Sequence, residues 1–80
     1  MIVNVKLYAT LRHLSPPGTG IGEAFTLELE EGSVSEALEK LKIGEERAKL
    51  ILVNGVHVRK RDLRLKDGDM LVIFPPVAGG

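Results

Sequence analysis

The residues of this chain best suited to chemistry are its last seven, FPPVAGG, from Phe74 to Gly80. The two prolines cannot donate backbone hydrogen bonds, so a strand that reaches Phe74 must stop there. Val77 is the one sizeable apolar side chain after them, and Ala78, Gly79 and Gly80 then taper to almost no side chain. Such a tail suits a narrow channel in which any larger side chain would collide with the wall.

The group that this tail would deliver is the α-carboxylate of Gly80. A carboxylate is unreactive until it is activated, so the activating chemistry must come from a partner enzyme. Pro75 and Pro76 would direct the tail away from the body, and the segment from Pro75 to Gly80 spans at most roughly 20 Å. Small residues are also common at disordered termini. The stiff exit and the valine before the glycine pair favour a delivered carboxylate.

Other groups that could do chemistry are few. The chain has no cysteine, so it offers no disulfide, thiolate ligand or cysteine nucleophile. His13 and His57 fall in different elements, and we expect no metal site. The glycines of GTGIG lack the spacing and the preceding strand of a dinucleotide-binding motif. Glu28, Glu30 and Glu31 alternate on a wet strand face or enter a turn, and solubility explains them.

The charge of the chain argues against polyanionic partners. Eleven basic and eleven acidic residues give a net charge of zero, so we expect no binding to nucleic acid or to a membrane. Arg59, Lys60 and Arg61 form the one basic cluster, which could touch RNA or an acidic patch on a partner. No aromatic residues are interleaved, so a solvated turn is favoured. Without a signal peptide, the expected location is the cytoplasm.

The elements that must position the tail fit one domain over residues 1–74, followed by an extended, flexible tail over 75–80. Apolar residues alternate from Ile2 to Tyr8 and again from Phe25 to Glu30, which predicts two half-buried strands. RHLSPPGTGIGEA, from Arg12 to Ala24, predicts a loop between them.

One helix is predicted after the second strand. Ser33 and Glu36 have the spacing of a capping box, and Gly44 is placed to end the helix. The apolar face between them is formed by Val34, Ala37, Leu38 and Leu41. A short turn is expected in EERAK, directly after Gly44.

Three further strands follow. LILV predicts a strand, and the NG after it predicts a hairpin that returns through Val56 and Val58, with His57 on the opposite face. A turn is expected at Asp67 and Gly68. MLVIF then predicts a central strand, because it is apolar throughout. If this strand lies beside the first one, a single helix covers one face of a mixed sheet, which is an α+β fold.

The segment VNGVHV…LKDGDMLVIFPPVAGG resembles the C-terminal half of the ubiquitin-like sulfur carriers, the MoaD/ThiS family. LYATLRHL and LEEGSVSEALEKL also match that family, and the likeness is greatest to small subunits of molybdopterin synthase. The resemblance implies a ubiquitin-like β-grasp fold, with a mixed sheet of four to five strands and one main helix packed on one face.

The resemblance also implies a mechanism. An adenylating, E1-like enzyme would use ATP and Mg²⁺ to activate Gly80, and a sulfur donor would convert the acyl-adenylate to a thiocarboxylate. The carrier, which binds no cofactor and is not catalytic, would dock on the large subunit of molybdopterin synthase in a heterotetramer and give its sulfur to a pterin precursor. The residues that would thread the tail into the partner are Gly79, Ala78, Val77, Pro76 and Pro75.

Two departures from the family pattern leave other functions open. Ala78 stands where many relatives have serine, and Met70 stands where many have an acidic residue. The alternatives are a sulfur carrier for another pathway such as thiamine synthesis, a modifier joined to protein lysines, and a plain interaction domain. Phe74 is a candidate partner contact, although its place at the end of an apolar strand favours the core.

Overall fold

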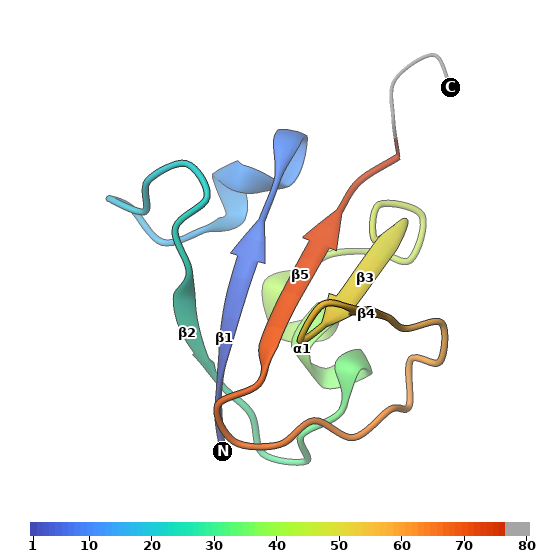
Figure 1. Cartoon of the computed structure of the whole chain (residues 1–80). Coiled ribbons are helices and arrows are strands. Elements are labelled where there is room, and N and C mark those ends of the chain that lie inside the picture. The colour runs from blue at the N-terminus through green and yellow to red at the C-terminus, as the bar shows by residue number, and fades with distance from the viewer. Residues whose placement is uncertain (77–80) are drawn as a thin grey trace.

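The computed structural model describes residues 1–76 of the chain. A mixed sheet is crossed on one side by a single α-helix, with a short 3-10 helix near the start of the chain (Figure 1). In chain order the elements are β1 (Ile2–Leu7), η1 (Ala9–Leu14), β2 (Phe25–Glu28), α1 (Val34–Leu41), β3 (Leu50–Val53), β4 (Val56–His57) and β5 (Met70–Phe74).

The sheet has five strands in the order β2-β1-β5-β3-β4. The first and last strands lie side by side in its centre and run parallel, with Leu7 opposite Ile73. The other three pairings are antiparallel. The prediction that MLVIF forms a central strand beside the first one is therefore confirmed.

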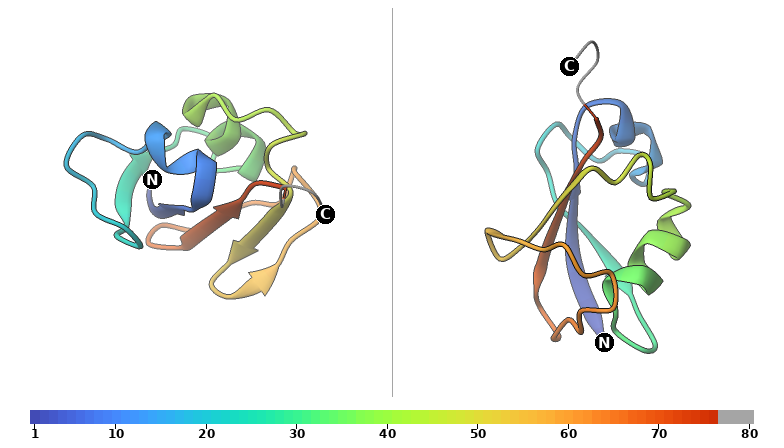
Figure 2. Two further views of the ribbon diagram at one scale, coloured as in Figure 1. Left: turned by 90° about the horizontal axis from the view of Figure 1, so that it is seen from above. Right: turned by 90° about the vertical axis from the view of Figure 1, so that its right-hand side faces the viewer.

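The core lies between this sheet and α1. The right-hand view of Figure 2 shows the helix on one side of the sheet. Alternate residues of β1 and β5 point toward the helix, and Val5, Leu71 and Ile73 have no exposed surface. The helix contributes its predicted apolar face, namely Val34, Ala37, Leu38 and Leu41. One helix packed on a mixed sheet with parallel central strands is the β-grasp architecture, so the predicted α+β fold class is confirmed.

The start of α1 confirms half of the predicted capping box. The Ser33 hydroxyl accepts a hydrogen bond from the Glu36 N–H at 3.1 Å. The Glu36 carboxylate does not return to Ser33 but accepts from the N–H groups of Glu30, Glu31 and Gly32, at 2.6, 2.8 and 2.7 Å. The Glu30 bond is the largest of the effects that lower the pKa of Glu36, and partial burial opposes it. This carboxylate therefore fixes the turn that leads into the helix.

The predicted end of the helix at Gly44 is wrong. The helix stops at Leu41, and Lys42 takes the left-handed conformation that caps it, with φ of 60°. The next residue, Ile43, is 5% exposed and donates its N–H to the Leu38 carbonyl at 3.0 Å. Because Ile43 is buried in the core, the helix ends before Gly44. The predicted turn in EERAK is present over residues 45–47.

The predicted loop from Arg12 to Ala24 begins too early. Residues Ala9–Leu14 form the 3-10 helix η1, which buries Leu11 completely. From Ser15 to Ala24 the chain has neither helix nor strand, as predicted. Ala9 enters η1 with φ of 53°, a conformation that non-glycine residues rarely adopt.

The turns predicted at Asn54 and at Asp67–Gly68 are both present, and the side chain of Asn54 joins them. Asn54 of the NG turn donates from its amide to the Asp69 carboxylate and accepts from the Met70 N–H, each at 2.9 Å. At the other turn, the Asp67 carboxylate accepts from the Ile2 N–H at 2.7 Å. The end of the molecule remote from the last residues of β5 is therefore closed by side chains.

Within residues 1–76, no helix has the length and apolar character needed to cross a membrane.

Candidate functional site

The predicted tail begins directly after β5. The strand ends at Phe74, directly before the two prolines, of which Pro75 is half-buried and Pro76 is exposed. Val77, Ala78, Gly79 and Gly80 lie outside the described residues, so the roles predicted for them stay predictions. What the structure does give is the base from which the tail starts.

The end of β5, where the tail begins, is hydrogen-bonded on both sides. The Lys49 N–H donates to the Phe74 carbonyl at 3.0 Å, and the Tyr8 N–H donates to the Ile73 carbonyl at 3.3 Å. The Tyr8 and Phe74 rings also stack, with centroids 4.8 Å apart. Nearby, the Arg47 guanidinium donates to the Thr10 carbonyl at 3.3 Å and links the loop before β3 to η1. The tail therefore starts from an ordered strand end.

The prediction that Phe74 belongs to the core is wrong. Ile73 faces the helix and is fully buried, whereas Phe74 is half-buried and lies outside the core cluster. The reason is the period of the strand, since neighbouring residues point to opposite faces of a sheet. Phe74 thus lies on the face that α1 leaves uncovered.

That uncovered face carries an apolar cluster beside the start of the tail. The register places Leu50 opposite Phe74 and Leu52 opposite Val72, and all four side chains are half-buried. We define the open-face patch as Tyr8, Leu50, Leu52, Val72 and Phe74. Apolar side chains that are partly exposed side by side on an uncovered sheet face are candidates for an interaction site.

Polar residues border the open-face patch. Lys6 lies opposite Val72 on the neighbouring strand β1. His57, predicted to point away from its valine neighbours, lies opposite Leu52 and is exposed. An apolar centre with a polar rim is the usual anatomy of a protein–protein interface.

This patch was not predicted, although the sequence carries a signal for it. LILV and MLVIF are apolar at every position, whereas a strand with one wet face would alternate. That pattern indicated a central strand, and it equally indicates apolar residues on the face opposite the helix. Tyr8 gave no separate signal, because its position beside Phe74 depends on the parallel pairing of β1 and β5.

The three residues of the basic cluster, Arg59 to Arg61, differ in their exposure. Arg59 and Lys60 are exposed, in keeping with a solvated turn. Arg61 is partly buried, and its guanidinium donates to the carbonyls of Ala48 and Arg59 at 3.1 and 3.2 Å. The Arg61 carbonyl in turn accepts from the backbone N–H and the hydroxyl of Ser35, at 2.8 and 2.9 Å. Arg61 is therefore a structural tie between the loop and the helix.

The histidines and carboxylates of the described residues do not gather into a metal-binding group. His13 and His57 are both exposed and lie in different elements, η1 and β4. Across residues 1–76, no group of three histidine, aspartate or glutamate side chains is placed to hold a metal ion. The site is thus a surface and a strand end, with reactivity predicted only at Gly80.

The model of the ThiS family matches residues 5–80. Among solved structures, the chain is similar to a Pyrococcus furiosus protein assigned as molybdopterin converting factor, subunit 1, with 33% identity over 95% of this chain and 98% of the other, and a TM-score of 0.69. No curated protein matches the chain.

Two further structures share the fold at lower identity. SAMP1 from Haloferax volcanii, a small archaeal modifier protein, is 21% identical over the full length of both chains, with a TM-score of 0.69. A complex of subunits 1 and 2 of the molybdopterin-converting factor from Helicobacter pylori contains a chain that is 24% identical over the full length of both, with a TM-score of 0.63. The chain shares the ubiquitin-like β-grasp fold with these neighbours, and in this chain the fold has one main helix on a five-stranded mixed sheet.

Proposed function

Since the chain belongs to the ThiS family of small ubiquitin-like carriers, we propose that it carries sulfur on the carboxyl group of Gly80 for the synthesis of molybdopterin. On this proposal Gly80 is the C-terminal residue of the working protein. The observation that carries the proposal is the strand end described above. A central strand held on both sides leads into the sequence PPVAGG, with the open-face patch next to it.

The proposed chemistry takes place in two steps on a partner enzyme. The Gly80 carboxylate attacks the α-phosphorus of ATP, pyrophosphate leaves with Mg²⁺, and an acyl-adenylate forms. A sulfur nucleophile then attacks the acyl carbon. AMP leaves and takes with it the carboxylate oxygen that linked its phosphorus to the acyl carbon. If the donor is a persulfide, two electrons from a thiol or another reductant release the donor and leave the thiocarboxylate. The carrier supplies no catalytic residue to either step.

The tail and the body have separate tasks in this proposal. Gly79 and Ala78 allow close approach in the partner's channel, Val77 anchors the thread, and the Pro75–Pro76 pair keeps it extended. The body provides recognition through the open-face patch, which makes the later sulfur transfer effectively intramolecular. Phe74 belongs to both parts, because it ends the strand and lies in the patch.

The partner that we propose for the loaded carrier is the large subunit of molybdopterin synthase. Support comes from the similarity to a molybdopterin converting factor subunit 1, and from the Helicobacter pylori complex in which such a subunit is bound to subunit 2. Two carriers and two large subunits would form a heterotetramer, and the sulfur would pass to a pterin precursor.

Mass spectrometry of the intact protein tests the proposal. The chain is incubated with its adenylating enzyme, ATP, Mg²⁺ and a sulfur source, and we expect one oxygen of the Gly80 carboxyl group to be exchanged for sulfur. A chain lacking Gly80 is the matched control and should stay unmodified. If the full-length chain also keeps its original mass while a known carrier is converted by the same enzyme, the sulfur-carrier function is refuted.

A second candidate function is conjugation of Gly80 to lysine side chains of other proteins. It is favoured by the shared fold with the Haloferax volcanii modifier, although that similarity shows the fold alone. Peptides from cellular proteins that carry a Gly-Gly remnant of this chain on lysine would support conjugation. A sulfur carrier for thiamine synthesis is distinguished by the acceptor, since the loaded chain would then pass its sulfur to a thiazole precursor and leave the pterin unchanged.

A further inference from the structure

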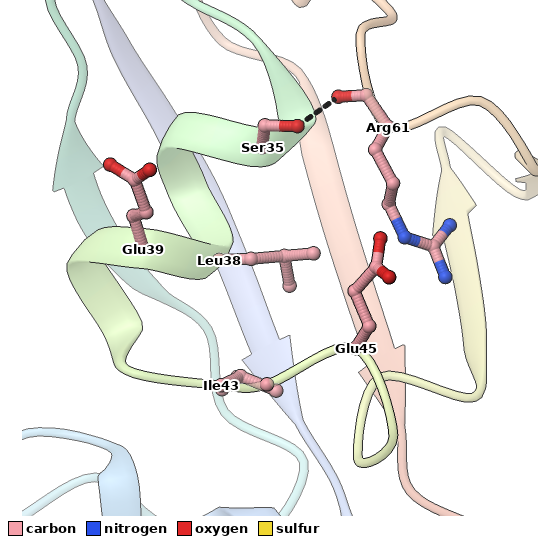
Figure 3. Close-up of a pocket in the computed structure, with 7 residues that line it drawn as sticks. Ser35, Leu38, Glu39, Ile43, Glu45 and Arg61 are labelled. Carbon is pink, nitrogen blue, oxygen red and sulfur yellow. Dashed lines mark hydrogen bonds between the residues drawn. The ribbon is translucent and has the colours of Figure 1, made fainter.

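The recess between α1 and the loop that carries Arg61 is spanned by contacts within the chain (Figure 3). The Ser35 hydroxyl donates to the Arg61 carbonyl at 2.9 Å, and the Arg61 guanidinium donates to the Ala48 carbonyl at 3.1 Å. Leu38, which lines the recess, is only 5% exposed. The recess therefore belongs to the packing of the helix, and a side chain with reactivity of its own lies elsewhere, in the NG turn.

The NG turn joins β3 to β4 and consists of Asn54 and Gly55, which are both exposed. In an asparagine–glycine pair the glycine nitrogen can attack the side-chain amide carbon of the asparagine, because no Cβ on the glycine hinders the approach. At Gly55, no atom beyond the neighbouring residues lies within 4 Å of the position that a Cβ would occupy. Within residues 1–76, the Gly55 N–H also donates to no acceptor. The attacking nitrogen is thus unhindered.

The side-chain amide of Asn54, in contrast, is held by the residues that lead into β5. Its Nδ2 donates to the Asp69 carboxylate and its Oδ1 accepts from the Met70 N–H, each at 2.9 Å. The Asn54 bond is the largest of the effects that lower the pKa of Asp69, so this acceptor is ionised at neutral pH. Attack by Gly55 would expel Nδ2, and the bond to Asp69 must therefore break for the reaction to proceed. The folded turn resists the reaction to which its sequence is prone.

We propose that Asn54 is a site of spontaneous deamidation, and that its hydrogen bonds to Asp69 and Met70 suppress the reaction until the turn opens. The Gly55 nitrogen loses its proton to hydroxide and bonds to the amide carbon of Asn54. Nδ2 then takes a proton from water and leaves as ammonia, and a succinimide ring remains. Water opens the ring at either carbonyl carbon and leaves aspartate or isoaspartate at position 54.

The product cannot restore the contact with β5. Aspartate has the shape of asparagine but no N–H to donate, and its carboxylate would lie where the amide of Asn54 now lies, 2.9 Å from the carboxylate of Asp69. Two like charges at this distance repel each other. Isoaspartate also lengthens the main chain of the turn by a carbon atom. Deamidation would therefore weaken the junction of the NG turn with β5 irreversibly, and this inference does not depend on the proposed sulfur chemistry.

Peptide mapping by mass spectrometry tests the proposal, because the chain has two asparagines, Asn4 and Asn54, and no glutamine. The full chain is incubated at mildly alkaline pH in buffer and in urea, and the mass gained when an amide becomes a carboxylate is followed at each asparagine. In urea, Asn54 should react at least about tenfold faster than Asn4, whose attacking nitrogen belongs to the β-branched Val5. In buffer, Asn54 should react at least about tenfold more slowly than it does in urea. Equal rates at Asn54 in the two conditions, or at the two asparagines in urea, would overturn the proposal.

Two alanine variants show whether Asp69 provides the protection. Asp69→Ala removes the acceptor of the Asn54 amide and should speed deamidation in buffer about fivefold. The matched control is Asp67→Ala, which removes a carboxylate that accepts from the Ile2 N–H in the same turn. It should change the rate at Asn54 by less than about twofold. The rates are compared at a temperature at which circular dichroism shows both variants to be folded, and equal rates would refute the role of Asp69.

An exchange of the two groups tests the consequence of deamidation for the fold. Asn54→Asp should lower the Tm, because it places a carboxylate against that of Asp69. The double variant Asn54→Asp/Asp69→Asn again pairs one amide with one carboxylate and should recover most of the lost Tm. If the single variant is as stable as the wild type, or the double variant is less stable than the single one, deamidation does not weaken this junction.

Discussion

The ring of Tyr8 lies almost parallel to that of Phe74, with centroids 4.8 Å apart and an angle of 10° between the planes. Tyr8 directly follows the first strand and Phe74 ends the last one, so this stack joins the two central strands at the point where the tail begins. An aromatic pair of this kind contributes about 0.5–1.5 kcal/mol beyond the area that it buries. Both rings remain partly accessible to a partner.

We expect Tyr8→Ala to weaken docking on the large subunit at least about tenfold, because the substitution removes an aromatic ring from the open-face patch. Isothermal titration calorimetry with the unloaded carrier measures this effect without any sulfur chemistry. Thr26→Ala, on the same face of the edge strand β2, is the control and should leave the affinity unchanged. Equal affinities for the two variants would show that the open-face patch is not part of the docking surface.

The Glu36 carboxylate should make the fold sensitive to acid. Hydrogen bonds led by that from Glu30 lower its pKa from the ordinary value of 4.5. The stability that this shift provides is present above pH 4.5 and is lost as the pH falls through the lower pKa of the folded state. Glu36→Gln should therefore lower the Tm at pH 7 and have a smaller effect at pH 2. Thermal unfolding followed by circular dichroism at both pH values tests this, and Glu30→Gln should lower the Tm less at pH 7.

Lys42 offers a stabilising substitution. Its φ of 60° strains any residue that has a Cβ, and glycine avoids that strain. Lys42→Gly should be about 1 kcal/mol more stable than Lys42→Ala, which keeps the strain and also loses the lysine side chain. Urea denaturation of the two variants gives the comparison. A glycine variant less stable than the alanine variant would show that this cap is not strained.

Leu11 is the residue through which η1 joins the core. It has no exposed surface, so Leu11→Ala should cost about 2–5 kcal/mol of unfolding free energy. Leu63→Ala, at a position that is 38% exposed, should cost less than about 1 kcal/mol and serves as the control. Chemical denaturation measures both. If the two variants lose similar stability, η1 is not an integral part of the fold.

One residue added after Gly80 should separate folding from loading. The described body ends in a strand at Phe74, so an added alanine should leave the Tm unchanged. It should also abolish formation of the thiocarboxylate, because Gly80 would then have no free carboxyl group. Intact-mass analysis with the adenylating enzyme reads the loading. Sulfur incorporation into the extended chain would contradict the assignment of Gly80.

The strands were predictable because their signals are local. Alternation in Ile2–Leu7, the NG turn at Asn54 and the capping interaction of Ser33 each depend on neighbours in sequence, and the structure contains all three. The central place of β5 was also predictable, since a strand apolar at every position needs cover on both sides.

The features that were mispredicted depend on contacts between distant residues. The 3-10 helix η1 forms because Leu11 can be buried in the core, and the sequence before Ser15 has no marker for that burial. The end of α1 is set by the return of Ile43 to the core, which takes precedence over the glycine at position 44. At the site, Phe74 was wrongly placed in the core because every residue of β5 is apolar. The sequence therefore does not say which alternate residues face the helix, and this is set by the pairing of β5 with β1.

The place of β5 in the sheet also affects how the protein is made. It is the last strand in the sequence but lies between β1 and β3, so the sheet cannot close until nearly all of the chain has left the ribosome. A product of translation that stops before Met70 would lack the middle of its sheet. Only chains synthesised through β5 would therefore be able to reach the folded state.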